Sequence, residues 1–274
     1  MPQQTRKKLI LMGTNDFVVP VFDFLSKNHD IISVFTRAPK PVGRKHILTR
    51  SPVHDWAVEN GIPVHTTIRE FNIGDADYVF VMSYGVLLSD NILSTGKFIN
   101  IHPSSLPKYR GASPIRTALL NGDTDMDVCL MQIVSEMDAG GVYLRKNINI
   151  DENDTNETLE KKVSQTSIEI LQEFFADDDK FSPEPQIGEP TYTRKFTGSD
   201  EIIDWTKTPY EIHNLVRALG CGRTKINGVD VKIVETAIKN SGLEIIKIQP
   251  AGKTVMDWKS FVNGLHGAEI KYGE

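Results

Sequence analysis

The sequence has only two cysteines in 274 residues, and they lie far apart, at positions 129 and 221. This scarcity excludes a disulfide framework and a cysteine-based metal motif. Long apolar runs are missing too, since none approaches the roughly 20 residues that a membrane-spanning helix needs. The basic first residues lead into a short apolar run that ends at Gly13, too short for a signal peptide. We therefore expect a cytoplasmic protein without membrane association.

The sequence also lacks the glycine patterns of nucleotide cofactors. Its first strand-to-helix junction carries Gly13 alone, where a dinucleotide fold needs three glycines at fixed spacing. A phosphate-binding loop is absent as well, so ATP-dependent chemistry has no anchor. These absences exclude nicotinamide, flavin and ATP-dependent activities, and no metal is expected.

The composition is that of a soluble globular protein, with 39% hydrophobic and 24% charged residues. A net charge of −5 hides an asymmetry along the chain. Residues 1–50 carry nine Lys and Arg against three Asp and Glu, whereas residues 151–190 carry three against twelve. Such a distribution suits a polyanion that docks on one face, but it also arises by chance. Charge alone therefore decides nothing about the partner.

Short apolar β runs alternate with helical patterns over about the first 175 residues. The predicted strands are residues 8–12, 31–36, 78–82, 98–101, 128–133 and 142–150. Predicted helices are residues 18–25, 52–59 and 113–120, and a long helix that Asp154 and Glu157 open as a capping box. This alternation predicts an α/β fold, with a Rossmann-like, doubly wound, mostly parallel sheet.

Residues 176–194 are rich in acids, proline and glycine, which is typical of a linker rather than a packed element. A helix at residues 209–219, a hairpin turn at Asn227-Gly228 and a strand at residues 243–248 follow, and then a short helix near residues 255–265. We expect an N-terminal catalytic domain at residues 1–188, a linker at residues 189–199 and a small C-terminal β domain at residues 200–274.

Three polar residues stand out from their small or apolar neighbours. Asn100 and His102 are two apart at the end of a β run, so both side chains leave the same face of the strand. Asp138 comes from a separate loop that Gly140 and Gly141 follow. An amide that polarises a carbonyl, an imidazole that moves a proton and a carboxylate that orients it suit acyl transfer. Each residue alone is more often structural, so the argument depends on their combination.

The combination resembles the folate-dependent formyltransferases. Their Asn-x-His motif, Ser-Leu-Leu-Pro-like loop, Arg-Gly pair and Asp-x-Gly motif match Asn100 and His102, residues 104–107, Arg110-Gly111 and Asp138-Ala139-Gly140, with Ser105 where the family more often has Leu. The resemblance implies catalysis by Asn100, His102 and Asp138, with 10-formyltetrahydrofolate as the formyl donor. It assigns folate binding to Gly13, Thr14, Phe17, Tyr84, Gly85, Val86, Leu87, Ser104, Ser105, Leu106 and Pro107.

Two further segments resemble the branch of this family that acts on initiator methionyl-tRNA. The basic loop between residues 37 and 50 contains Pro-x-Gly-Arg before Ser-Pro-Val, which is similar to the RNA-gripping insertion of that branch. This implies tRNA binding by Arg37, Lys40, Arg44, Lys45 and Arg50. Residues 248–253 resemble the closing strand of its C-terminal oligonucleotide-binding (OB-like) barrel. Only about eight residues (237–244) stand where the branch usually has an extra strand pair, so we expect a shortened, OB-like domain.

The resemblance implies formylation of methionine on initiator tRNA for translation initiation. Separately, we expect the protein to be a monomer. One alternative is a sugar-nucleotide N-formyltransferase, against which the basic loop and residues 249–253 speak. Another is a catalytically idle, folate-responsive RNA-binding protein, against which the complete set of Asn100, His102 and Asp138 speaks.

Overall fold

The computed structural model describes residues 5–43 and 46–273, and its contacts divide the chain into two compact units. The first contains Met1–Gly111, Asp127–Ile148 and Lys161–Tyr192. The second contains Ala112–Met126, Asn149–Glu160 and Thr193–Glu274. The chain enters the second unit for the last time at Thr193, within the linker of residues 189–199 expected from the sequence. The second unit also includes two earlier segments. Among the described residues, no helix is long and apolar enough to cross a membrane.

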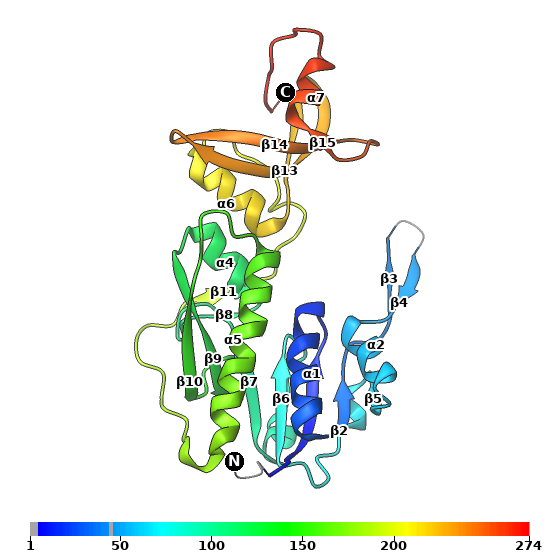
Figure 1. Ribbon diagram of the computed structural model, residues 1–274, viewed down its shortest axis with the longest axis vertical. Coiled ribbons are helices and arrows are strands. Elements are labelled where there is room, and N and C mark those ends of the chain that lie inside the picture. Colours follow the sequence, from blue (N-terminus) through cyan, green and yellow to red (C-terminus); the bar gives the residue numbers. More distant parts are fainter. Residues whose placement is uncertain (1–4, 44–45, 274) are drawn as a thin grey trace. The chain divides into compact units, whose positions relative to one another are not determined.

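The first unit is built on a seven-stranded sheet with the order β10-β9-β7-β6-β1-β2-β5 (Figure 1). Its strands are β1 (Lys8–Gly13), β2 (Asp30–Phe35), β5 (Val64–His65), β6 (Tyr78–Met82), β7 (Phe98–His102), β9 (Asp125–Gln132) and β10 (Val142–Asn149). The pairs from β5 to β7 are parallel, and β7 pairs with β9 antiparallel. The predicted mostly parallel, doubly wound sheet is confirmed.

Helices and loops cover both faces of this sheet, which explains why every residue of β6 is buried. On one face, Tyr78 and Phe80 pack edge-on against Phe174 of the long helix α5. On the other, Val79 and Val81 lie in an apolar cluster that the segment around α3 helps to close. The helices of this unit are α1 (Val19–Asn28), α2 (Pro52–Glu59), α3 (Asp90–Leu93) and α5 (Asn156–Ala176), whose first residues belong to the second unit. Helix α4 (Pro114–Asn121) belongs to the second unit.

Two local predictions need correction. Helix α5 begins at Asn156, and the hydroxyl of Thr155 accepts a hydrogen bond from the Thr158 N–H at its first turn. The start therefore lies one residue after the predicted one, because a threonine hydroxyl fills the cap position. The prediction that residues 176–194 are an unpacked linker is wrong. Glu184 forms a β-bridge with Val142, and the pair β8 (Arg110–Gly111) and β11 (Tyr192–Thr193) makes a small sheet.

The second unit contains a four-stranded sheet, in which each adjacent pair is antiparallel. Its strands are β12 (Gly222–Ile226), β13 (Val229–Lys239), β14 (Gly242–Pro250) and β15 (Met256–Asp257). Helix α6 (Pro209–Leu219) packs its apolar face on this sheet through Ile212 and Val216, and α7 (Trp258–Asn263) follows the last strand. The turn at Asn227-Gly228 is confirmed, with both residues at positive φ as a tight hairpin requires.

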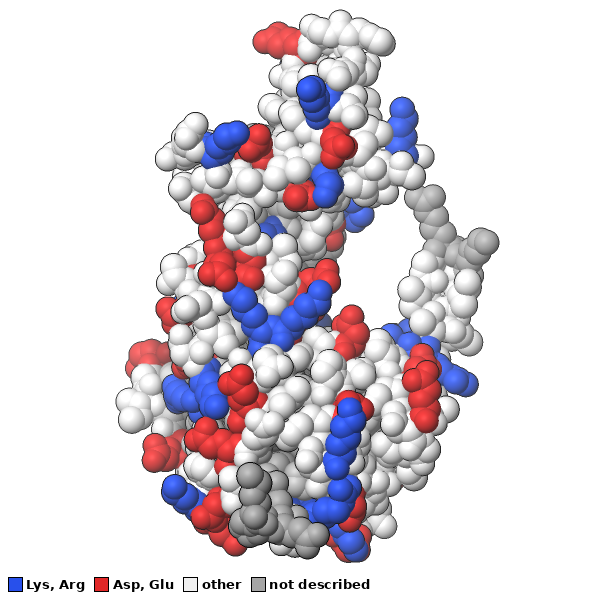
Figure 2. Space-filling model, in the orientation of Figure 1, with Lys and Arg blue, Asp and Glu red and all other residues white. Residues whose placement is uncertain are grey.

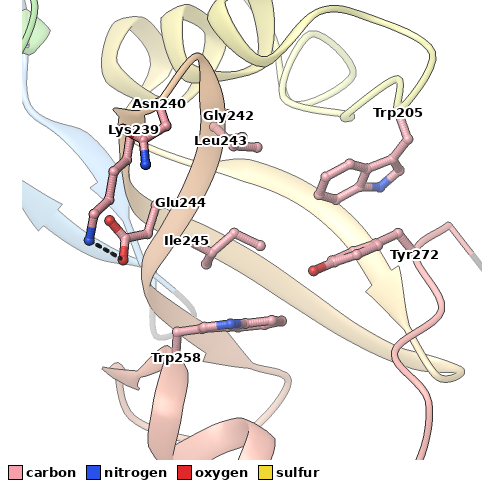
Figure 3. A pocket seen from close by; sticks show the side chains of 9 residues that line it. All are labelled: Trp205, Lys239, Asn240, Gly242, Leu243, Glu244, Ile245, Trp258 and Tyr272. Carbon is pink, nitrogen blue, oxygen red and sulfur yellow. Dashed lines mark ion pairs between the residues drawn. The ribbon is translucent and has the colours of Figure 1, made fainter.

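The connection near residue 240 is short, as the sequence shows. Asn240 and Ser241 join β13 directly to β14, and an open pocket of about 520 Å³ lies beside this turn. Figure 3 shows three aromatic side chains around it, from Trp205, Trp258 and Tyr272. The rings of Trp205 and Tyr272 are 4.3 Å apart between centroids. The sheet of this unit is therefore left partly uncovered at its aromatic end.

Candidate active site

Strand β7 carries two of the three predicted catalytic residues on one face. Asn100 lies beside Val81 of the neighbouring parallel strand, and His102 ends the strand with only 4% of its surface exposed. The carboxyl ends of parallel strands gather at one edge of a sheet, where open α/β folds keep their binding crevices. The alternation of the strand thus places an amide and an imidazole together, as the sequence predicts.

The imidazole of His102 is held in one orientation. Its Nε2 lies 3.0 Å from the carbonyl oxygen of Tyr109. Because a carbonyl oxygen can only accept, Nε2 carries the proton in this bond. The other nitrogen, Nδ1, lies 3.7 Å from Asp138 Oδ2. The structure therefore turns Nδ1 toward the carboxylate and leaves it as the nitrogen that can exchange a proton.

Asp138 connects the three elements of this cluster. Its Oδ2 accepts a hydrogen bond of 2.7 Å from the Gly111 N–H, and its Oδ1 accepts a long one of 3.5 Å from Asn100 Nδ2. Among the described residues, this long bond is the only hydrogen bond of the Asn100 side chain, so its amide remains available to a carbonyl oxygen. The structure thus brings Asn100, His102 and Asp138 together, although 38 residues separate the first from the last.

The loops after β1 and β6 lie next to each other and carry predicted folate-binding residues. Gly13 has no room for a side chain, because a Cβ there would lie 2.9 Å from the Met82 carbonyl and from the Phe22 ring. The Thr14 hydroxyl is 3.4 Å from the Tyr84 carbonyl oxygen, and Thr14 and Tyr84 are buried. Phe17, in the same loop after β1, is half-buried. This close approach requires a glycine at the junction, independently of any ligand.

The segment after Tyr84 leaves apolar side chains uncovered at the same edge. Val86 is 44% exposed and Leu87 is 81% exposed, and Gly85 at φ 75° turns the chain before them. Burial raises the pKa of Tyr84, so its phenol stays neutral in the apolar cluster. Exposed apolar side chains suit contact with a flat, partly polar ring. The structure thus leaves Val86 and Leu87 exposed after the turn at Gly85, and folate binding by these three residues stays a prediction.

The loop of residues 104–107 is tied into the protein by its side chains. Ser104 and Leu106 are buried, and the Ser104 hydroxyl donates to the Lys108 carbonyl. The Ser105 hydroxyl accepts a hydrogen bond of 3.0 Å from the Asp127 N–H. These side chains are engaged within the protein, so in this conformation the loop would contact a ligand through its backbone or through Pro107.

The basic segment between β2 and α2 is an ordered hairpin rather than an irregular loop. Its strands β3 (Lys40–Val42) and β4 (Ile47–Thr49) pair antiparallel, and every residue of both is exposed. Arg37 is half-buried at its base, whereas Arg50 is exposed. Of the five predicted tRNA-binding residues, Arg44 and Lys45 lie outside the described residues. The sequence did not predict these strands because the two prolines hide an edge pairing that proline tolerates.

Two residues at the site have contacts to which the sequence assigned no role. Arg110, 8% exposed, donates to Glu136 Oε1 at 2.9 Å and to Gln186 Oε1 at 2.8 Å. Gln186 lies in the segment predicted to be an unpacked linker. Its amide donates to the backbone carbonyls of Asp138 and Gly140, at 2.8 Å each. Arg110 belongs to the Arg-Gly motif, but nothing in the pattern around Gln186 signals a role.

The Cys129 thiol, on the strand that pairs with β7, is not activated for covalent chemistry. Burial raises the pKa of the Cys129 thiol to about 11, and this thiol lies against the Ser104 carbonyl at 3.1 Å. Cys129 is therefore a neutral core residue and not a nucleophile. Among the residues that the structure describes, no three His, Cys, Asp or Glu side chains are grouped to hold a metal ion.

Comparison with known proteins places the chain in a family. Residues 6–174 match the description "Formyl transferase", and residues 195–242 match "Formyl transferase, C-terminal domain". A methionyl-tRNA formyltransferase from Rickettsia bellii is 33% identical, with 94% of this chain and 96% of the relative aligned.

Solved structures show the same fold. A sugar 3N-formyl transferase, determined in the presence of dTDP and 5-N-formyl-THF, has a TM-score of 0.69 at 23% identity, with coverage of 91% of this chain and 100% of that one. A methionyl-tRNA formyltransferase from Clostridium thermocellum has a TM-score of 0.66 at 13% identity, with coverage of 89% and 98%. Both domain matches, with a relative aligned over nearly its full length, show that this chain belongs to the formyl transferase family.

Proposed function

We propose that this protein transfers the formyl group of 10-formyltetrahydrofolate to the α-amine of methionine on initiator tRNA, for translation initiation in the cytoplasm. The observation that carries the chemistry is the cluster of Asn100, His102 and Asp138, held by Gly111 and the Tyr109 carbonyl. The near full-length similarity to relatives named methionyl-tRNA formyltransferase supports the choice of acceptor.

The cluster fits the demands of formyl transfer. Negative charge develops on the formyl oxygen as the amine attacks, and Asn100 Nδ2 is the donor available to it. When Nδ1 carries a proton, His102 would donate a hydrogen bond from it to the same oxygen. Its other nitrogen, Nε2, already donates to the Tyr109 carbonyl. The attacking amine must lose one proton, and the leaving nitrogen of the donor must gain one. Asp138 is the only acceptor-only side chain of the cluster, so in this proposal it relays that proton.

The hairpin of β3 and β4 is proposed to hold the RNA. Lys40 and Arg50 are exposed on or beside it, and Val42, Ile47 and Leu48 expose apolar surface that bases can cover. On the face drawn in Figure 2, Lys and Arg side chains alternate with Asp and Glu, without a large area of one sign. The segment of residues 37–50 contains five Lys and Arg and no acid, so it suits a polyanion through counterion release at each phosphate.

A single transfer assay tests the proposal. The purified chain is incubated with formyl-labelled 10-formyltetrahydrofolate and either charged initiator methionyl-tRNA or an amino-sugar nucleotide. We expect label in the methionyl-tRNA and none in the sugar. Label in the sugar alone would replace the proposal by a sugar N-formyltransferase, and folate and RNA binding without transfer would favour an idle binding protein. Light scattering of the active sample tests whether the enzyme is a monomer.

A further inference from the structure

The side-chain amide of Gln186 uses its full hydrogen-bonding capacity at the catalytic loop. Nε2 donates one proton to the Asp138 carbonyl and the other to the Gly140 carbonyl, both at 2.8 Å. Oε1 accepts from Arg110 Nε at 3.1 Å and from Arg110 Nη2 at 2.8 Å. A fully satisfied amide in a partly buried position fixes the groups around it.

The loop that Gln186 holds is one that would relax without support. Asp138 has φ 50°, in the left-handed region that is unfavourable for a residue with a Cβ. Two residues later the chain has no spare room, because a Cβ on Gly140 would lie 1.9 Å from the Gln132 carbonyl oxygen. The loop thus packs against β9 in a strained conformation. The two bonds from Gln186 bracket Ala139 and fix the backbone from which the Asp138 carboxylate projects.

Gln186 also reaches the second anchor of that carboxylate. Arg110, which Gln186 holds, directly precedes Gly111, and the Gly111 N–H donates to Asp138 Oδ2 at 2.7 Å. Glu136, at the start of the same loop, holds the Arg110 guanidinium from the other side at 2.9 Å. Gln186 therefore sets both the backbone of Asp138 and the strand that grips its side chain.

We propose that Gln186 is a positioning residue of formyl transfer, which acts through Asp138 rather than on a substrate. This inference rests on the proposed function for its catalytic readout. The amide protons matter more than the contact to Arg110, since the two donated bonds hold the strained loop directly. The segment of residues 183–186 is accordingly part of the catalytic unit and not a spacer between domains.

Two variants separate these roles. Gln186→Glu keeps an acceptor for Arg110 but loses both amide protons and places a carboxylate against two carbonyl oxygens. Gln186→Met keeps the length and loses every hydrogen bond. In both, we expect kcat to fall roughly 10- to 100-fold, because an ångström-scale misplacement of a catalytic group costs up to about that much. The KM for folate should change less than twofold. Ile187→Ala, at a neighbour that is 90% exposed, is the matched control and should behave like wild type.

A second measurement needs no formyl-accepting substrate. Amide hydrogen exchange, followed by NMR on the free protein, should be faster at Gly111 in both Gln186 variants and unchanged in Ile187→Ala. Wild-type kcat or wild-type exchange at Gly111 in Gln186→Glu would overturn the proposal. A drop in kcat that comes with lost folate binding would also overturn it, as general misfolding. If the wild-type chain transferred no formyl group, the proposed function would fail, while the exchange at Gly111 would still decide the role of Gln186.

Discussion

The proposed catalytic cluster and the proposed RNA-binding hairpin lie in the same unit but are built in opposite ways. Around Asp138, side chains and backbone groups are tied by short hydrogen bonds, and His102 is buried. In β3 and β4, every residue is exposed, and the strands pair only with each other. Proton transfer requires groups held within a fraction of an ångström, whereas a flexible polyanion requires reach and charge. The first region therefore depends on neighbouring residues, and the second on its own composition.

One glycine from each region shows the difference between a packed loop and an exposed turn. Gly140 is required by space, since any Cβ would collide with the Gln132 carbonyl oxygen. Gly43 is required by conformation, since it has φ 70° while nothing lies within 4 Å of its Cβ position. A packed loop thus constrains the volume of its residues, and an exposed turn constrains only the backbone.

The largest effect is expected where the cluster contacts the substrate. Asn100→Ala and His102→Ala should each lower kcat by about 100-fold or more, the usual loss when a donor to a developing oxyanion is removed. The KM for folate should change little. Single-turnover measurement of formyl transfer to methionyl-tRNA tests this. Asn91→Ala, at an exposed position of α3, is the control. More than about a third of the wild-type rate in either variant would remove that residue from the mechanism.

The packing of the catalytic loop can be broken without touching a polar side chain. Gly140→Ala should lower kcat at least tenfold and destabilise the fold by roughly 1–3 kcal/mol, as overpacking does. Gly198→Ala is the matched control, because its Cβ would meet nothing closer than 3.8 Å, at the Arg223 guanidinium. Thermal unfolding and the transfer assay measure both effects. Equal behaviour of the two variants would mean that the loop is no more constrained than an exposed turn.

Charge removal on the hairpin should act on RNA alone. In the double variant Lys40→Ala and Arg50→Ala, we expect the KM for methionyl-tRNA to rise roughly tenfold, as the loss of charged phosphate contacts predicts. The dependence of log kcat/KM on log salt should become shallower by about two, one for each contact. Folate binding should stay constant. Arg69→Ala, elsewhere on the first unit, controls for net charge. Identical salt slopes in all three proteins would reduce the hairpin to ordinary surface.

The smallest expected effect concerns pH and a residue outside both regions. Burial lowers the pKa of His29 from 6.5 to about 4, and its ring packs on Phe175 at 4.0 Å. The unfolded chain therefore binds this proton first as the pH falls, so stability decreases between pH 6.5 and pH 4. His29→Gln should reduce this loss of stability. The difference in melting temperature between pH 7.0 and pH 4.5 should then be roughly 2–4 °C smaller than in the wild type. Thermal unfolding at pH 7.0 and pH 4.5 checks this. An unaltered pH dependence in the variant would contradict the assignment.

Local patterns predicted much of this fold, because they report local physics. Helix α6 follows its predicted bounds from Pro209 to Leu219, where Thr208 and Glu211 form a reciprocal cap. The hairpin at Asn227-Gly228 also follows from backbone preference alone. Gln186 was not predictable, since its role arises from four hydrogen bonds to residues 46 to 76 positions away. The prolines and acids around Gln186 have the composition of a linker. Only its tertiary contacts distinguish this packed segment from an unpacked linker.

The interleaving of the two units limits how such a chain can be rearranged in evolution. The second unit takes Ala112–Met126 and Asn149–Glu160 from within the stretch that builds the sheet of the first. A recombination point near residue 193 would exchange the terminal portion but leave those two segments with their former ancestry. In the hybrid protein, the second unit would then be built from segments of two different ancestries. Inheritance of the whole chain as one block is therefore the simpler route.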